Sequence, residues 1–249
     1  ATLPPHSLPN AWIGTGVKVD GIKRMADELR LQSVRVNTSE YSRLNTFAGF
    51  NGRIDNLLAD KDAGLAPAMQ AFFNSVQAAA ADPASAPTRN VMLTEGQNLA
   101  SRFHFFDARL TELDAETNQR IELVVDEINE LASAVARLNH DIAVALGYSQ
   151  GSPPNDLLDR RDALLEQISA RVGTLVVPQD DGMVSVFIGN GQALVAGNET
   201  NRLAATENEF DHSRKEISYV SGHGTVNITR NISGGTLGGL LEFRRESLD

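Results

Sequence analysis

The hydrophobic positions form their most regular pattern between Thr88 and Leu146. Apolar residues recur there with alternating gaps of four and three, a heptad spacing that places them on one stripe of an α-helix. The stripe comprises Leu99, Phe103, Phe106, Leu110, Leu113, Thr117, Arg120, Val124, Ile128, Leu131, Val135, Leu138, Ile142 and Ala145. Thr117 and Arg120 interrupt it, and Ile121 can take the inward position beside them. The pattern predicts one helix roughly 80–90 Å long, at about 1.5 Å per residue.

The residues around this stretch predict how the long helix begins and ends. Asp82 followed by Pro83 suits an N-cap aspartate with proline at the first helical position. Gly147 suits the left-handed conformation that ends many helices. We therefore expect the long helix to begin at Asp82-Pro83 and to end at Gly147.

Three further segments have helical spacing. The first runs from about Ile22 to Ala59; its stripe becomes polar along the way, and we expect it to weaken or break between Gly49 and Gly52. Gly64 to Ala81 is a second amphipathic helix, and Asn155 to Ala170 is a shorter one that carries acidic and basic residues on its polar face. The first two of these segments are amphipathic helices that could cover the long one, and Phe103 and Phe106 are bulky for a dimeric seam. This favours a bundle within one chain over pairing with a second chain.

After Arg171 the hydrophobic period changes from that of a helix to that of a strand. The strand candidates are Thr174–Val177, Met183–Ile188, Ala193–Ala196, Arg202–Ala205, Glu216–Val220 and Val226–Thr229. Residues 179–182 and 189–192 suit tight turns, so we expect one small antiparallel sheet with a face against the helices. Ser233 to Gly239 predicts a flexible passage, after which a helix starts at Leu240. Near the other end, residues 1–10 should be irregular and residues 14–21 a short extended segment.

These elements predict an α+β fold, an elongated bundle with one very long α-helix plus a small antiparallel β domain. The expected domains are a helical rod over residues 1–171, a β domain over 172–236, and the start of a returning helix of the rod over 237–249.

Composition narrows the classes of partner. The chain holds 22 Lys and Arg against 32 Asp and Glu, a net charge of −10. Nucleic acids and anionic membranes would repel this charge, so we expect neither as a partner. There is no cysteine for disulfides or thiolate chemistry, and no apolar run of 18 residues that could span a membrane. The first residues lack a methionine and a signal pattern, which suggests a trimmed segment of a longer protein.

No catalytic, cofactor or metal site is predicted. The five histidines, His6, His104, His140, His212 and His223, have no ligand spacing. Asp156, Asp159 and Asp162 recur every three residues on one helical stripe beside Arg160 and Arg161, which favours ion pairs and capping over calcium.

Two other patterns suggest chemistry but lack the residues that the chemistry needs. The glycine-rich stretch 234–239 lacks the spacing of a dinucleotide loop and follows no parallel βαβ unit. A hydrolase on a helical stalk would need paired carboxylates in the β region. The candidates for that role are Asp180, Asp181, Glu207, Glu209 and Asp211, which lie in predicted turns without a histidine at useful spacing. We expect no enzyme.

Four short blocks, in this order, carry a resemblance to a known family. They are Gly14-Thr15-Gly16-Val17 with Val19; Asn155 with Leu157-Leu158-Asp159 and Arg161-Asp162; Gly189-Asn190-Gly191 with Leu194-Val195; and Gly235, Leu237 to Leu241, Phe243-Arg244 with Leu248-Asp249. Over residues 14–249 the chain resembles the bacterial flagellar hook-associated proteins of the hook–filament junction, the FlgK type. Another axial flagellar protein, such as a different hook-associated protein or a flagellin, is the alternative; the hydrolase is a more distant one.

The resemblance implies a structural subunit that acts by self-assembly in a ring-like layer and joins hook to filament. It implies contacts with the hook protein and the next hook-associated protein, an export chaperone, and secretion through the flagellar type III apparatus to an extracellular flagellum. Family members also carry terminal helical segments that drive assembly, and this chain has no match to them. We therefore expect a core fragment that is monomeric in solution.

Overall fold

The structure is a computed structural model that describes residues 6–8, 11–13, 27–59, 64–148 and 153–248. The extended segment predicted at 14–21 and the first residues of the helix predicted from Ile22 lie outside these ranges. Near the start of the chain, β1 (His6–Leu8) pairs antiparallel with β2 (Ala11–Ile13). The prediction of an irregular backbone up to residue 10 was therefore wrong for β1.

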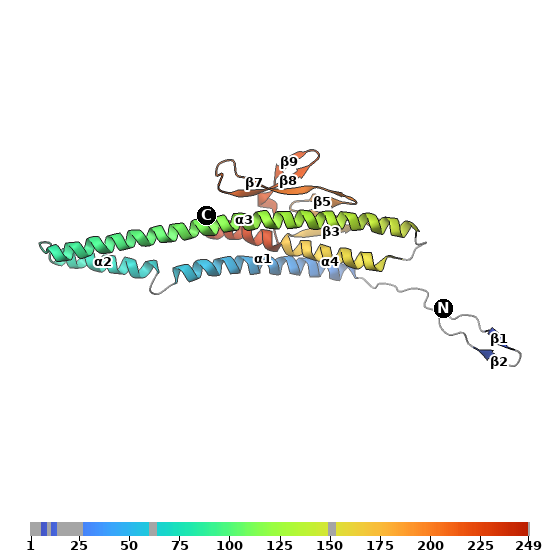
Figure 1. The fold of residues 1–249 in the computed structure, drawn as a ribbon, viewed down its shortest axis with the longest axis horizontal. Coiled ribbons are helices and arrows are strands. Elements are labelled where there is room, and N and C mark those ends of the chain that lie inside the picture. The colour runs from blue at the N-terminus through green and yellow to red at the C-terminus, as the bar shows by residue number, and fades with distance from the viewer. Residues whose placement is uncertain (1–5, 9–10, 14–26, 60–63, 149–152, 249) are drawn as a thin grey trace.

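One helix, α3 (Ala86–Tyr148, 63 residues), runs the length of the helical body (Figure 1). At about 1.5 Å per residue it is roughly 95 Å long. Two shorter helices, α1 (Glu28–Leu58) and α2 (Leu65–Ala81), lie end to end along one side of it. A fourth, α4 (Asn155–Arg171), packs on both α3 and α1. The predicted elongated bundle with one very long helix is confirmed.

The predicted interruption of the first helix does not occur: α1 continues through Gly49 and Gly52. A glycine inside a helix costs about 1 kcal/mol relative to alanine. Between the two glycines, Phe50 packs on Phe243 with ring centroids 5.1 Å apart. We attribute the unbroken helix to this tertiary contact, which outweighs the local propensity.

The predicted start of the long helix was also wrong. Asp82 ends α2, where its N–H donates to Ala78 O, and α3 begins four residues later at Ala86. Ser85 occupies the capping position, since Thr88 N donates to Ser85 Oγ at 3.5 Å. The acidic cap and the proline belong to the turn between the two helices. At the other end α3 reaches Tyr148, one residue past the predicted stop at Gly147.

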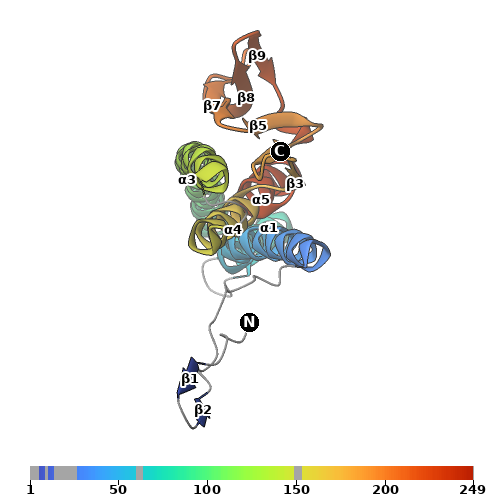
Figure 2. The same ribbon diagram turned by 90° about the vertical axis from the view of Figure 1, so that its right-hand side faces the viewer.

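The β region forms two antiparallel sheets instead of the single sheet that was predicted. The first has strand order β3-β4-β5-β6, and the second has order β7-β8-β9. The strands are β3 (Thr174–Pro178), β4 (Val184–Ile188), β5 (Gln192–Ala196), β6 (Glu199–Thr200), β7 (Arg202–Glu207), β8 (Lys215–Ser221) and β9 (Gly224–Asn227). Figure 2 shows both sheets on the same side of the helices. The strand predicted at Val226–Thr229 begins and ends two residues earlier, because Thr229 starts the 3-10 turn η1 (Thr229–Asn231).

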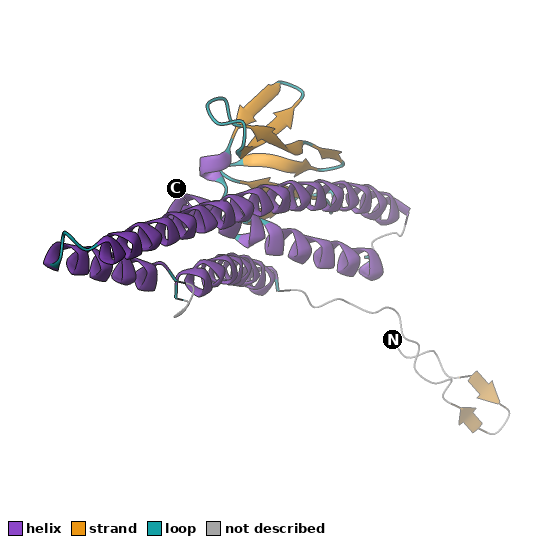
Figure 3. Ribbon diagram, turned by 60° about the vertical axis from the view of Figure 1, so that its left-hand side comes forward, coloured by secondary structure: helices purple, strands orange, loops and turns teal. Residues whose placement is uncertain are grey.

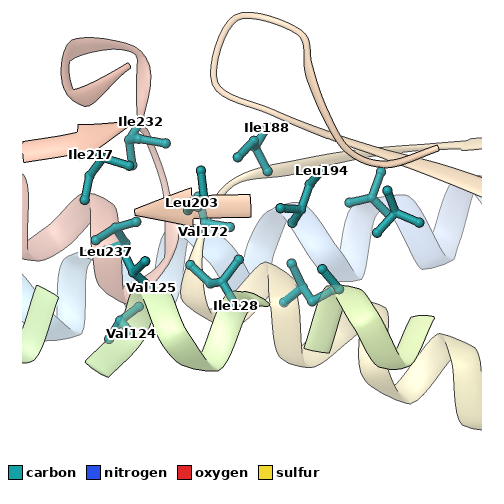
Figure 4. Close-up of a cluster of buried hydrophobic side chains, with 14 of the residues drawn as sticks. Val124, Val125, Ile128, Val172, Ile188, Leu194, Leu203, Ile217, Ile232 and Leu237 are labelled. Atoms are coloured by element: carbon teal, nitrogen blue, oxygen red, sulfur yellow. The ribbon is translucent and has the colours of Figure 1, made fainter. Parts of the chain in front are cut away.

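A single hydrophobic core joins helices and sheets. Val124, Val125 and Ile128 of α3 face Leu203 of β7 and Ile217 of β8 (Figure 4). All five side chains are at most 2% exposed. Burial of this apolar area, at roughly 25 cal/mol per Å², fixes the β layer onto the middle of α3.

The glycine-rich stretch predicted to be flexible is instead the first part of a buried helix, α5 (Gly235–Phe243). A Cβ at Gly239 would lie 2.5 Å from Arg43 O, so only glycine lets α5 approach α1 this closely. Gly235 has φ +61 and abuts the backbone at Arg171 and Val172. These glycines serve close helix packing. The chain continues into a single π-helical turn, η2 (Arg244–Leu248).

Candidate functional site

Among the described residues no three His, Cys, Asp or Glu side chains gather where they could hold a metal ion. Of the acidic residues on α4, Asp162 Oδ1 accepts from Arg35 Nη2 at 3.2 Å, which ties α4 to α1. Arg35 is only 3% exposed and also pairs with Glu28. Asp162 therefore has the ion-pair role expected for this stripe.

The carboxylates considered for a hydrolase are exposed, and all lie in turns except Glu207, which was predicted in a turn but ends strand β7. Asp181 Oδ1 accepts from Met183 N, and Asp211 Oδ1 accepts from the N–H and hydroxyl of Ser213. His212 Nδ1 does lie 3.6 Å from Glu207 Oε2, a pairing that the sequence did not indicate, but both side chains are more than half exposed. The hydrogen bonds of Asp181 and Asp211 shape the turns that hold them.

The most organised polar arrangement is a row of three asparagines on α3, Asn118, Asn129 and Asn139, here called the asparagine row. Each is at most 9% exposed and each bonds backbone of the β region. Asn129 is the clearest case, because its Nδ2 donates to Leu203 O and its Oδ1 accepts from Leu203 N, both at 2.8 Å. The side-chain amide thereby pairs with β7 as a neighbouring strand would.

The other two members bond in the same two-sided way. Asn118 Nδ2 donates to Ser213 O at 3.1 Å, and its Oδ1 accepts from Lys215 N at 3.0 Å. Asn139 Nδ2 donates to Val184 O at 2.8 Å, and its Oδ1 accepts from Val184 N at 3.2 Å. The row thus fixes the register of both sheets along α3, which hydrophobic contacts alone do not specify.

Arg161 of α4 joins the row at one end. Its Nη1 donates to Asn139 Oδ1 at 3.2 Å and to Gly182 O at 2.7 Å, and the residue is 7% exposed. Arg161 was predicted on the polar face of its helix, whereas the structure buries it between α3 and the turn before β4. The structure gives it a positioning role, and a ligand is not needed to explain its burial.

The sequence pattern did not identify the asparagine row. One signal was available: the three asparagines are spaced 11 and 10 residues apart, close to three helical turns, and so lie along one side of α3. That side is offset from the heptad stripe, because α3 buries one face against helices and a second against strands.

An uncovered apolar surface marks the end of the body away from the sheets, where α2 and the first part of α3 form a two-helix arm (Figure 3). Within residues 86–112 of α3 only Phe106 is buried. Large apolar side chains on the arm are exposed, namely Met69 38%, Phe73 57%, Val91 53%, Leu93 61%, Phe103 50%, Phe105 42% and Leu110 38%. Phe103 and Leu110 belong to the predicted heptad stripe, so the stripe continues past the point where this chain covers it. Large apolar side chains exposed in such number on one arm make it a candidate interaction site.

Comparison with known proteins identifies the family. A family model described as the flagellar hook-associated protein FlgK helical domain matches residues 51–249, which is most of the chain. The chain belongs to the FlgK family. Flagellar hook-associated protein 1 of Salmonella typhimurium is 35% identical over 240 residues, 96% of this chain and 43% of the relative. The Escherichia coli protein of the same name is 34% identical over 96% of this chain and 44% of its own length.

A solved structure of the FlgK family agrees with this fold. The flagellar hook junction protein FlgK from Burkholderia pseudomallei superposes with a TM-score of 0.78 at 31% identity, over 88% of this chain and 39% of that one. This chain therefore spans less than half the length of these FlgK relatives. None of the helices in the described ranges is long and apolar enough to cross a membrane.

Proposed function

We propose that this chain is the stiff central part of a structural subunit that joins the hook to the filament of a bacterial flagellum. It acts by subunit contacts and catalyses no reaction. The observation that carries the proposal is the uncovered apolar surface of the α2–α3 arm, at the end of a 63-residue helix. A protein that works by assembly needs such a surface, whereas an enzyme would need a pocket lined by catalytic side chains.

In this proposal, helical segments of the longer parent protein and neighbouring subunits cover the exposed apolar side chains of the arm. Two helices alone bury little, and α2 has only Ser75 and Ala79 buried. A third helix along Phe73 and Phe103 would complete a bundle, in which apolar stripes face one another. By this proposal the chain without those segments is monomeric.

The wider partners follow from the family and are part of the proposal. They are further copies of the same subunit in a ring-like junction, the hook protein, the next hook-associated protein and an export chaperone. The place of action is the extracellular flagellum, reached through the flagellar type III apparatus. No nucleic acid or membrane is required, in keeping with the net charge of −10.

We also retain the division into a helical rod over 1–171, a β domain over 172–236 and a returning helix from 237 as a proposal. The shared core of α3, β7 and β8 supports a β domain that folds only on the rod. Residues 172–236 expressed alone should therefore lack cooperative melting. A folded isolated β domain would contradict this dependence.

The function is tested in cells that produce the full-length parent. Deleting its gene should leave hooks without filaments, as seen by electron microscopy. A parent with Phe73→Glu and Phe103→Glu should fail in the same way, because each charge lies on the apolar surface of the arm. This chain with the same two changes should keep its melting temperature, since both side chains are at least half exposed.

A matched control is Val226→Glu on β9, an apolar side chain 58% exposed on the opposite part of the molecule. It should leave filaments intact. Normal filaments in the gene deletion would overturn the junction function. Normal filaments in the doubly substituted parent would overturn only the role of the arm.

A further inference from the structure

A hollow whose charged lining is mostly arginine lies between the second sheet and the end of α5. Its volume is about 590 Å³, and its charged lining consists of Arg214, Arg230, Arg244, Arg245 and a single acidic residue, Glu216. We call it the arginine pocket. The lining thus has four cations against one anion in a chain whose net charge is −10. Two of the four also approach carboxylates outside the lining, Arg214 at 3.8 Å from Asp211 and Arg245 at 3.4 Å from Glu246.

Arg244 forms the wall of the pocket and is 7% exposed. Its Nη1 donates to Lys215 O at 2.6 Å and to Asn118 Oδ1 at 3.3 Å, both neutral acceptors. No ion pair joins its guanidinium to a carboxylate among the described residues. Burial is the largest influence on the pKa of Arg244 and lowers it. The neighbouring cation Arg214 lowers this pKa further, whereas the carboxylates of Asp114, Glu216 and Asp211 raise it. A buried charge is normally paired, and these carboxylates offset the burial of Arg244 only in part, because none forms an ion pair with its guanidinium.

The carboxylates nearest the pocket are already engaged. Glu216 accepts hydrogen bonds from the side-chain amides of Asn208 and Asn227. Asp211 accepts from the N–H and the hydroxyl of Ser213, and its other oxygen lies 3.8 Å from Arg214. Glu216 lines the pocket and Asp211 approaches Arg214 of its lining, and neither forms an ion pair with the guanidinium of Arg244.

We propose that the arginine pocket binds carboxylate side chains of an acidic segment of a neighbouring subunit. A guanidinium presents its N–H groups in a planar fork that matches a carboxylate. The volume exceeds that of a single small anion and fits two or three side chains of a peptide. Subunits that each carry a large negative charge repel one another, and a basic recess on one copy turns acidic residues of the next into an attraction.

The claim that the segment comes from a neighbouring subunit rests on the proposed junction function. The claim that the pocket binds carboxylates does not depend on that function. The two parts are therefore tested separately. The binding part uses this chain and a fluorescein-labelled hexaglutamate peptide, followed by fluorescence anisotropy at low salt. Hexaglutamine serves as the uncharged peptide and inorganic phosphate as the free anion.

Hexaglutamate should bind, hexaglutamine should not, and added salt should weaken the complex because exposed charges are screened. The double variant Arg230→Glu and Arg245→Glu should weaken binding at least tenfold. Both side chains are exposed and hold no element together, so the fold should survive, as melting will verify. Arg137→Glu is the matched control: it is an exposed arginine on α3, 19 residues and about 28 Å along the helix from Asn118, and it should change nothing.

Equal binding by the double variant, or no binding by the parent chain, would overturn the proposal. Binding of phosphate without binding of the peptide would mean an adventitious ion only, and would overturn it as well. For the source, a photo-crosslinking residue in place of Arg230 of the full-length parent should join two flagellar subunits in cells. If no crosslink forms in cells with normal filaments, a neighbouring subunit does not supply the acidic segment. The proposed junction function would be unaffected by that result.

Discussion

At the scale of single residues, stability depends on a few polar groups and glycines that hydrophobic patterning does not reveal. The asparagine row satisfies backbone groups of the sheets that would otherwise be buried without partners. Gly239 removes a side chain where α5 meets α1. Each of these features makes a prediction about a single substitution.

Asn129→Leu should destabilise the chain by about 2–4 kcal/mol, because it leaves the N–H and C=O of Leu203 buried and unpaired. The measurement is the free energy of unfolding in urea. Asn90→Leu, the same change at an exposed position of the same helix, should alter it by less than about 0.5 kcal/mol. Equal effects of the two changes would remove the special role of Asn129.

Gly239→Ala should cost about 1–3 kcal/mol, because the added methyl group overlaps Arg43 O and must push the helices apart. Gly49→Ala adds the same group where nothing lies within 4 Å and should stabilise α1 by up to about 1 kcal/mol. Thermal melting of the two variants would show shifts of opposite sign. A stabilising Gly239→Ala would contradict the close packing described above.

At the scale of elements, periodicity predicted most helices and strands correctly, and two of its failures share a cause. The heptad stripe placed α3, and Ile121 takes the inward position expected of it at 0% exposure. The break at Gly49, the cap at Asp82 and the flexible glycines before Leu240 were local interpretations. Contacts of α1 with α5, which is distant in sequence, decide the positions at Gly49 and before Leu240, and no local pattern reports them. At Asp82 the competing cap is local, because Ser85 caps α3 instead.

The absence of a chemical site stays a prediction. The residues that organise the β layer were missed for a different reason, since asparagines within an apolar helix resemble ordinary surface positions. Their spacing alone does not distinguish a buried row from an exposed one. The asparagines acquire a role only through the second packing face of α3, which meets β-region backbone 45 to 97 residues later in the chain.

The ion pair between Arg53 of α1 and Glu116 of α3 makes stability depend on pH. Two contacts of 2.6 and 2.7 Å join the side chains, and the hydrogen bonds from Arg53 lower the pKa of Glu116. The pair therefore contributes fully above the ordinary pKa of glutamate, about 4.3, and its contribution is lost as pH falls through the lower folded value. Both side chains are 47% exposed, so the effect is under about 1 kcal/mol.

Glu116→Gln should accordingly lower the free energy of unfolding at pH 7 and flatten its fall in acid. Chemical unfolding between pH 3 and pH 7 measures both. Glu130→Gln, an exposed glutamate elsewhere on α3, gives the same change of charge as a control. A parallel pH dependence for the Glu116 variant and the parent would show that the pair contributes nothing.

At the scale of the whole molecule, the shape is a long rod with a compact outgrowth on one side (Figure 1). In solution the chain should have a largest dimension of at least roughly 95 Å, set by α3 at about 1.5 Å per residue. Small-angle scattering measures this dimension, and sedimentation velocity should give one monomeric species at low concentration. A stable oligomer, unaffected by dilution, would show that the exposed apolar arm pairs with another copy without the rest of the parent protein.

The uneven thickness along α3 has a mechanical consequence. One half of the helix is braced by α4, α5 and two sheets, with α1 packed on α4 and α5, whereas the arm has α2 alone beside it. The bending stiffness of a beam rises steeply with its cross-section, so thermal bending concentrates in the arm and the braced half moves as one block. A force applied at the tip of the arm would therefore deflect the thin end first. The same thinness lets the arm adjust its angle as it meets a neighbour, before that contact stiffens it in turn.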